Sequence, residues 1–416
     1  MTREARPGKA DDLRKEMVER LEASGAIRSA AVRQAFLAVA REHFVPEIAA
    51  RDGLEAVYRP QAALVTATDQ AGRAISSASA PAIMALMLEA LELGPGMSVL
   101  EVGAGTGYNA ALLERLVGPT GRVVSLELEP AFARRARRAL REVGSRCAVV
   151  ARDGRLGHER SAPFDRIIVT ASTEQLPRTW CEQLVEGGLV EVPMRLVAGG
   201  SLQAVITFRR EGAFLRSVTV LPGGFMPLRG AGLEQPAEQT PLLGGWVNAG
   251  RRTRARHNVV SLSSNAGSSM AASVARRSLA TMLGPSRVAG VLQRERAEGL
   301  IMFLALSSDR RLCACSRDGR FGYAVVGDGG SSVAAVTIAF GTGARIEQWG
   351  GDEAGRRLEE HIERLSLLGK PRLSELRVCV DFDESTRGAS WRTRRLAGST
   401  IRIDWLAPPV TRTKAR

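Results

Sequence analysis

Apolar residues recur at helical spacing in the first part of the chain. Leu13, Met17 and Leu21 share one face of a predicted helix over residues 10–23, and residues 29–41 carry the same kind of pattern. Apolar positions that return every three or four residues indicate amphipathic helices. The chain is therefore predicted to begin with two helices that each bury one side.

From about residue 82 onward, short apolar runs alternate with helical patterns. The predicted order is a helix over 82–92, a strand over 98–103, a helix over 108–117, a strand over 122–127, a basic helix, strands over 147–151, 164–170 and 187–194, and a helix near 176–185. Strands separated by helices pair in parallel, which predicts a doubly wound α/β sheet. Residues 202–222 read as two strands joined by a short charged turn, so we expect an antiparallel edge.

The composition changes after about residue 230. Residues 233–269 are rich in Pro, Gly, Ser and Asn and are predicted to link a first domain, 1–232, to a second domain, 270–416. A chain of 416 residues also exceeds what one hydrophobic core usually supports. In the second domain residues 355–368 predict an amphipathic helix, and strands are expected over 300–308, 321–328, 332–341, 375–383 and 399–406. This C-terminal α+β domain carries no recognisable catalytic motif.

Composition narrows the class of protein. Hydrophobic residues make up 44% of the chain and aromatic residues 5%, which is typical of a soluble α/β protein. No apolar run approaches the roughly 20 residues of a membrane-spanning helix, and the N-terminus is charged, so a cytoplasmic protein with no membrane partner is expected. The five cysteines lack the spacing of a disulfide framework. Cys313 and Cys315 are predicted to be buried neighbours on a strand, and no metal site is expected.

The formal net charge of +14 is large, but the arginines are dispersed along the chain. Residues 133–141 have the spacing of a solvated helix face. Residues 250–257 form either a linker or a strip that binds acidic partners. Aromatic residues do not accompany either cluster, so no nucleic-acid partner is expected.

A glycine-rich turn carries the strongest chemical signal. Gly103, Gly105 and Gly107 end a predicted strand and open a predicted helix, where free N–H groups let the backbone approach a ligand closely. The spacing differs from the G-x-G-x-x-G of dinucleotide binders. Glu127 follows the next strand, where a carboxylate can accept hydrogen bonds from both hydroxyls of a ribose, and Asp153 follows the third, within reach of an adenine amino group. Together these features predict a binding site for S-adenosylmethionine.

The same region resembles a known family. The segment VLEVGAGTGYNAALLERLVGPTGRVVSLE, followed by RDG and by APFDRIIVTASTEQLPRTWCEQLVEGGLVEVPM, is similar to the protein L-isoaspartyl O-methyltransferase family, as is the upstream REHFVPE. The resemblance covers roughly residues 10–220. It implies a mostly parallel, Rossmann-like sheet of the class I methyltransferase type with an antiparallel edge.

The resemblance also implies an activity. The enzyme would move a methyl group from S-adenosylmethionine to an aspartyl or isoaspartyl carboxylate of a peptide, with S-adenosylhomocysteine as the other product. The ester would then collapse to a succinimide, which hydrolyses to aspartate and isoaspartate. Neighbouring positions complete the expected cofactor-binding set: Glu101, Thr106, Tyr108, Leu128, Gly154 and Thr170.

The segment ISSASAPAIM precedes a predicted helix and resembles the I-S-[AQ]-P-H segment of the family. The match begins at Ser79, but Ala82 stands where the family usually has histidine, and Ser76 and Ser77 are added ahead of it. The resemblance implies that a serine hydroxyl here contacts substrate, so these three serines are the predicted catalytic residues. Alternatively, Ser79 only caps the helix, with Pro81 in the first turn; both roles can hold at once.

Three functions remain open. The departures at the serine segment and the long C-terminal addition favour a specialised substrate. The segment GGFMPLRG also resembles part of the homologues that modify ribosomally made peptides, such as lanthipeptides. The main prediction is therefore methylation of an aspartate in a cyclised precursor peptide. The first alternative is general protein repair, and the second is a binding or regulatory protein that retains a methyltransferase fold.

Overall fold

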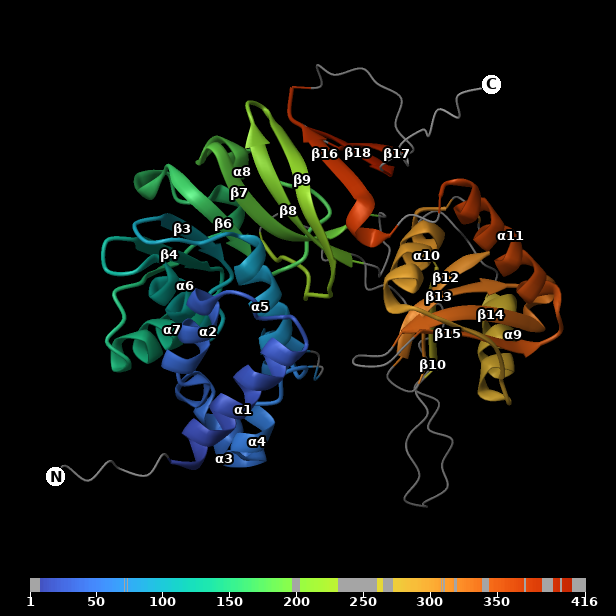
Figure 1. Cartoon of the computed structure of the whole chain (residues 1–416), viewed down its shortest axis with the longest axis horizontal. Helices are drawn as coiled ribbons and strands as arrows, with labels where there is room; N and C mark the ends of the chain where they lie inside the picture. The colour runs from blue at the N-terminus through green and yellow to red at the C-terminus, as the bar shows by residue number, and fades with distance from the viewer. Residues whose placement is uncertain are drawn as a thin grey trace, which may run out of the picture.

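The protein is described here by a computed structural model. It describes residues 8–70, 72, 74–196, 203–230, 260–264, 272–307, 309, 311–317, 320–338, 344–369, 372–383, 392–396 and 399–405. These residues form a ten-stranded sheet, a six-stranded sheet and a two-stranded hairpin, each of the two larger sheets with its own helices (Figure 1).

Five parallel strands form the centre of the larger sheet. In spatial order they are β5 (Ala148–Ala151), β4 (Arg122–Glu127), β3 (Ser98–Val102), β6 (Phe164–Val169) and β7 (Leu184–Arg195). The crossover helices are α6 (Tyr108–Val117), α7 (Pro130–Glu142) and α8 (Arg178–Glu182). Successive residues of β3 enter opposite cores, Val99 on one face and Leu100 on the other. The predicted doubly wound parallel sheet is confirmed.

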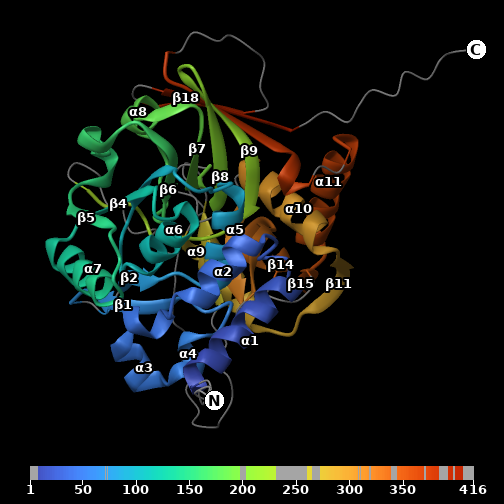
Figure 2. The ribbon, with the colours of Figure 1, turned by 60° about the vertical axis from the view of Figure 1, so that its left-hand side comes forward.

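Helices cover one face of this sheet densely. The N-terminal helices are α1 (Lys9–Ala23), α2 (Ala30–Ala38), α3 (Pro46–Asp52) and α4 (Leu54–Val57), and α5 (Pro81–Ala90) follows the hairpin of β1 (Leu64–Thr68) and β2 (Ala74–Ala78). Figure 2 shows α2 and α5 beside α6, and all three share one hydrophobic core. On α7, Ala133, Ala136 and Leu140 are buried while the arginines face outward, as predicted for residues 133–141.

The antiparallel edge is longer than the sequence predicted. The expected pair, β8 (Gln203–Glu211) and β9 (Phe214–Pro222), is present and adds to β7. Beyond β9 the sheet continues through β16 (Leu376–Asp381), β18 (Ser399–Trp405) and β17 (Arg392–Leu396). These strands belong to the range 270–416 that was expected to form a second domain, yet they are hydrogen-bonded into the first sheet. The predicted domain limits themselves remain a prediction.

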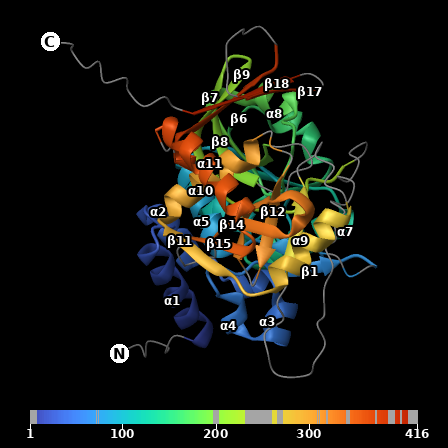
Figure 3. The same cartoon turned by 90° about the vertical axis from the view of Figure 1, so that its right-hand side faces the viewer.

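The described residues between 260 and 369 form what we call the inserted unit, because it lies in sequence between β9 and β16. Its antiparallel sheet has the order β10 (Val260–Ser264), β12 (Leu312–Arg317), β13 (Arg320–Val326), β14 (Ser332–Ile338), β15 (Ala344–Gly350) and β11 (Arg287–Leu292). Helices α10 (Arg294–Leu306) and α11 (Glu353–Leu367) share a core on one face, and α9 (Ala272–Leu283) packs on the other (Figure 3). Short 3₁₀ turns lie at Arg41–Phe44, Gly154–Leu156, Glu159–Ser161, Asp328–Gly330 and Leu373–Glu375.

One predicted strand is wrong. Residues 300–308 were expected to form a strand, but 300–306 are the C-terminal half of α10. An apolar run of this length does not separate a buried strand from a buried helix. The C-terminal half of this helix is apolar on all sides because it lies between two cores: Met302 and Leu306 pack with the larger sheet, whereas Phe303 and Leu304 pack within the inserted unit. It therefore couples the two sheets directly.

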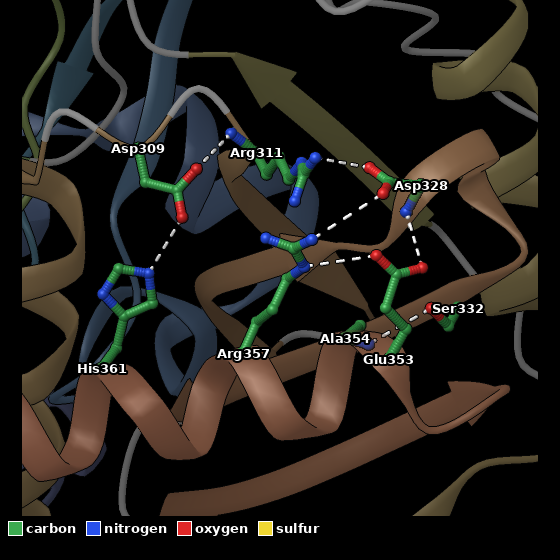
Figure 4. A network of polar contacts seen from close by, with 8 residues as sticks. All are labelled: Asp309, Arg311, Asp328, Ser332, Glu353, Ala354, Arg357 and His361. Carbon is green, nitrogen blue, oxygen red and sulfur yellow. Dashed lines mark hydrogen bonds and ion pairs between the residues drawn. The ribbon is translucent and has the colours of Figure 1, made fainter.

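A polar network joins the segment that follows α10 to α11 and to the turn at Asp328–Gly330 (Figure 4). Nε2 of His361 lies 3.1 Å from Oδ2 of Asp309, and the backbone N–H of Arg311 donates to the other oxygen of that carboxylate at 2.9 Å. His361 is buried and meets the ring of Phe303 edge-on. The Arg311 guanidinium continues the network to Asp328 at 2.6 Å. These contacts fix α10 relative to the rest of the inserted unit.

The predicted burial of two cysteines side by side on a strand is confirmed. Cys313 and Cys315 are buried on β12 within one core. Within the described ranges no helix is long and apolar enough to cross a membrane, and no three His, Cys, Asp or Glu side chains converge as metal ligands would. Residues 250–257 lie outside the described residues.

Candidate functional site

A cavity of about 900 Å³ opens where the parallel strands end. Its floor is formed by the residues that follow β3, β4 and β6, and its walls by β2, α5 and the segment that follows β9. Ligands of open α/β sheets bind at the carboxyl ends of the strands. The fold therefore places this cavity where the sequence predicted the cofactor.

The turn between β3 and α6 requires its glycines. Gly103 has a φ of 102°, and a Cβ there would lie 2.3 Å from Oγ1 of Thr170. That hydroxyl donates to the carbonyl of Gly103 at 2.8 Å. Gly107 has a φ of 90° and precedes α6, with the Leu140 side chain 3.2 Å from where a Cβ would stand. A side chain at Gly103 would collide with Thr170, and one at Gly107 would crowd Leu140 and strain the backbone.

Glu127 ends β4 and faces the cavity. Its Oε2 accepts a hydrogen bond from the backbone N–H of Gly105 at 2.9 Å, and its Oε1 accepts one from the N–H of Glu129 at 3.2 Å. Burial raises the pKa of Glu127, and these backbone donors oppose that rise. The carboxylate is thus held at the rim of the glycine turn, beside Leu128 in the cavity lining.

Glu101 lies behind the turn and is fully buried. It accepts a hydrogen bond from Nδ2 of Asn109 at 2.8 Å and another from the hydroxyl of Ser125. Burial raises its pKa to about 7. Because it does not line the cavity, Glu101 supports the turn through Asn109 on α6 instead of contacting a ligand.

Asp153 forms an ion pair with Arg155. Its Oδ2 pairs with the Arg155 guanidinium at 2.6 Å, and its Oδ1 accepts from the backbone N–H of Arg155 at 3.0 Å. A Cβ on Gly230 would lie 2.7 Å from Oδ2, so the segment after β9 passes directly over this carboxylate. Gly154 lines the cavity, whereas Asp153 does not.

All three predicted serines line the cavity. Ser76 and Ser77 lie in β2, and Ser79 lies between β2 and α5. The hydroxyl of Ser76 accepts a hydrogen bond from Thr66 at 2.9 Å. The capping alternative is wrong, because the helix begins one residue later than a Ser79 cap requires. Ala80 is the N-cap and has no capping side chain, while Pro81 does occupy the first turn as expected.

Of the remaining residues that were predicted to bind the cofactor, some line the cavity and one lies behind it. Thr106, Tyr108 and Thr170 line the cavity with Gly103 and Gly105, whereas Gly107 does not. Tyr108 begins α6, and its ring is buried against Phe44 with centroids 5.6 Å apart. The structure thus gathers most of the expected set into one site.

Residues 222–229 form a wall of the cavity that was not predicted from the sequence. Ser172 holds this segment from β6, with its N–H donating to the carbonyl of Met226 at 2.8 Å and its own carbonyl accepting from Leu228 at 2.7 Å. The Gln203 side chain makes two bonds to the backbone of Phe225. The motif GGFMPLRG lies in this segment, but its sequence alone does not show that the segment folds back over the sheet.

Three arginines of the lining were also missed. Arg229 pairs with Glu129 at 3.2 Å and thereby joins the wall to the end of β4. Arg294 comes from the first turn of α10, so the inserted unit reaches the cavity. Arg41 is fully buried against the serine segment. Arginines are too frequent in this chain for sequence position to single these out.

The residues present fit S-adenosylmethionine. The glycine turn brings backbone to the cavity without side chains in between, and the Glu127 carboxylate stands where a ribose would need an acceptor. Apolar lining from Ile83, Met87 and Phe132 suits a methyl-transfer site from which water is excluded.

Comparison with known proteins gives one family. The family model described as "Protein-L-isoaspartate(D-aspartate) O-methyltransferase (PCMT)" matches residues 12–231. A protein-L-isoaspartate O-methyltransferase of Ignicoccus hospitalis is 36% identical over 219 residues, which cover 52% of this chain and 98% of that protein. One of Pyrobaculum neutrophilum is 39% identical over 51% of this chain and 97% of its own length. A solved protein-L-isoaspartate O-methyltransferase is similar over 89% of this chain and 97% of its own, with 25% identity and a TM-score of 0.49.

Proposed function

Because the chain belongs to the protein-L-isoaspartate(D-aspartate) O-methyltransferase family, we propose that it transfers a methyl group from S-adenosylmethionine to the free carboxylate of isoaspartyl residues in peptides and proteins. One observation carries this proposal. The glycine turn with Glu127 and the serine segment from Ser76 to Ser79 line the same cavity. A cofactor held at the first would meet an acceptor held at the second.

The chemistry requires few groups from the protein. An isoaspartyl carboxylate is already ionised at neutral pH, so no general base has to activate it. S-adenosylmethionine, when bound, supplies a methyl group on a sulfonium that is a good leaving group. The chain's own part is to orient the carboxylate and to exclude water, since alignment of two reactants alone accounts for a large share of such accelerations.

The serine segment provides the orienting groups. The hydroxyls of Ser77 and Ser79 can donate hydrogen bonds to the acceptor carboxylate without neutralising it. Ser76 is held by Thr66 and sets the position of β2 more than that of the ligand. After transfer, the ester is attacked by the neighbouring backbone nitrogen of the substrate, and this closure to a succinimide needs no group from the enzyme.

A second candidate is modification of a dedicated peptide. Methylation of an aspartate in a cyclised, ribosomally made precursor such as a lanthipeptide is favoured by one observation: α10 of the inserted unit contributes Arg294 to the cavity lining. Nearly half of the chain lies outside the matched residues 12–231. A wall added by this part would narrow the range of acceptors.

The test offers the enzyme three acceptors in the presence of S-adenosylmethionine: a short isoaspartyl peptide, its aspartyl isomer, and a cyclised precursor peptide. Mass spectrometry follows the gain of one methyl and the later loss of methanol. Methylation of the isoaspartyl peptide alone supports repair. Methylation of the cyclised aspartyl peptide alone supports the second candidate and overturns the first.

A retained fold without activity is a separate outcome. If S-adenosylhomocysteine shows no binding by calorimetry, both enzymatic proposals fail and the chain is a binding protein. Steeply salt-dependent binding of nucleic acid in the same protein would then identify its class of partner.

A further inference from the structure

Arg41 is a buried cation at the edge of the candidate site. It is inaccessible to solvent, and its guanidinium bonds the carbonyl of Ser79 at 2.8 Å and that of Ala78 at 3.4 Å. The same guanidinium lies 5.0 Å above the ring of Tyr108 and 3.7 Å from the sulfur of Met84. It therefore joins the serine segment to the first residue of α6.

This cation has no counter-ion among the described residues. Its recorded partners are two carbonyls, a thioether and an aromatic ring, and its Nε is buried without a hydrogen-bond partner. Burial of an ionised group away from an opposite charge is costly, and such groups are normally paired. Burial accordingly lowers the pKa of Arg41.

The other charges of the cavity do not neutralise it. Arg229 is paired with Glu129 at 3.2 Å and Arg294 with Glu298 at 2.8 Å. Glu127, the one acidic side chain in the described lining, is bound by the N–H groups of Gly105 and Glu129. Among the arginines of the described lining, Arg41 is therefore the one without a carboxylate partner. An anionic ligand would supply the charge that the protein does not.

We propose that Arg41 is the fixed counter-charge for a carboxylate bound in this cavity and that it positions the Ala78–Ser79 backbone against which that carboxylate lies. Arg41 is fully buried, so it acts through the serine segment and through its field and is a positioning residue. The inference rests on the proposed function, which offers two sources of a carboxylate: the isoaspartyl acceptor and the amino-acid end of the cofactor.

The test compares Arg41→Gln, which removes the charge, with Arg41→Lys, which keeps it. Arg166→Gln is the matched control, because Arg166 is a half-buried arginine that also donates to backbone carbonyls, those of Leu91 and Glu92, and does not line the cavity. For each protein the dissociation constants of S-adenosylhomocysteine and of methylthioadenosine, which lacks the carboxylate, are measured, together with kcat and KM for an isoaspartyl peptide.

A screened charge interaction of about 1.4 kcal/mol corresponds to a factor of roughly ten in affinity. Arg41→Gln is expected to weaken S-adenosylhomocysteine about tenfold and methylthioadenosine hardly at all if the cofactor supplies the carboxylate. If the acceptor supplies it, KM for the peptide rises about tenfold and both nucleoside affinities stay unchanged. Arg41→Lys should restore most of the loss in either case.

The proposal is overturned if Arg41→Gln and Arg166→Gln alter all three ligands to the same degree, or if Arg41→Gln alters none. If Arg41→Gln does not fold, the proposal is tested by ligand binding to the wild-type protein and to Arg41→Lys. The wild type's affinity for a carboxylate-bearing ligand must then exceed that for the matching carboxamide, and Arg41→Lys must preserve that preference. Failure of the proposed function is distinguishable, because the wild type would then methylate no peptide.

Discussion

At the scale of single residues, the hydroxyl of Ser79 has a role that sequence alone leaves ambiguous. Because Ala80 and not Ser79 caps α5, removing this hydroxyl takes nothing from the helix. Ser79→Ala is expected to lower kcat/KM for an isoaspartyl peptide by about tenfold to a hundredfold, as expected for the loss of one hydrogen bond to a charged group. The melting temperature should change by less than about 2 °C.

Thr66→Val is a useful comparison for this variant. It removes the partner of Ser76 on the neighbouring strand and should affect stability more than turnover. If Ser79→Ala lowers the melting temperature yet leaves methylation intact, the serine is structural and the assignment fails.

Glu101 makes stability depend on pH. Burial raises its pKa to about 7 from an unfolded value near 4.3, so the folded state holds its proton more tightly than the unfolded chain does. The stabilisation is therefore complete below about pH 4 and is lost as the pH rises toward 7. Denaturant unfolding from pH 5 to pH 8 should show a decline on the order of 2 kcal/mol from this group.

Glu101→Gln should flatten that part of the pH profile, since the amide cannot ionise. Glu142→Gln, at an exposed position on α7, is the control and should leave the profile as it is. Equal slopes in the wild type and Glu101→Gln would contradict the assignment. The sequence places Glu101 in the site, but only the folded structure shows that it stands behind the turn.

At the scale of elements, the turn between β3 and α6 is specified by local backbone geometry. Gly103→Ala puts a Cβ within 2.3 Å of Oγ1 of Thr170 at a φ of 102°. The substitution should cost about 2–4 kcal/mol of folding free energy and abolish binding of S-adenosylhomocysteine. Gly118→Ala is the control: its φ is also positive, at 67°, but no atom lies within 4 Å of the added carbon.

Gly118→Ala is expected to cost about 1–2 kcal/mol, from backbone strain alone, and to leave cofactor binding unchanged. The two variants are compared by thermal unfolding and by calorimetric titration. Similar losses of affinity in both would show that the turn does not form the binding site.

The spacing of apolar residues predicted most elements of the larger sheet correctly and one element of the inserted unit wrongly. The alternation of strand and helix from residue 82 to 194 is reproduced by the structure, because β3, β4, β6 and β7 contribute to the cores on both faces of the sheet, whereas α7 buries one side. The run at 300–306 was wrongly predicted to be a strand, because this half of α10 is enclosed by two cores and has no polar positions that would reveal a helical period.

At the scale of the whole molecule, the inserted unit and the larger sheet are not independent. The chain leaves the sheet after β9, builds a second sheet and returns as β16 beside β9. The return is fastened by the Ser217 hydroxyl, which accepts from the N–H of Val378 at 2.8 Å, and by Arg178, which pairs with Asp383 at 2.8 Å. The inserted unit is thereby held against the cavity.

This arrangement predicts a role for Arg294 in acceptor binding. Arg294→Glu reverses a charge in the cavity lining and should raise KM about fivefold to tenfold for a peptide with acidic residues beside the isoaspartate, through charge repulsion. The control is Arg296→Glu, because Arg296 is exposed, lies two residues further along α10 and does not line the cavity. This variant should have little effect on the KM for the acidic peptide.

Both variants should bind S-adenosylhomocysteine as the wild type does, and a neutral peptide should be much less affected than the acidic one. Steady-state kinetics with the two peptides decides this. If Arg294→Glu and Arg296→Glu behave alike, the inserted unit takes no part in acceptor recognition.

The sequence by itself determined the parallel sheet and the glycine turn, because these follow from local rules: the period of apolar residues and the backbone freedom of glycine. The serine segment was identified through its resemblance to the family. The tertiary structure decided what depends on contacts between distant segments. Only the folded chain places residues 222–229 and Arg294 on the cavity, covers Asp153 with Arg155, buries Arg41 without a counter-ion and joins β16 to β9. No local pattern encodes which remote strand supplies a hydrogen-bonded neighbour or which charge is left unpaired.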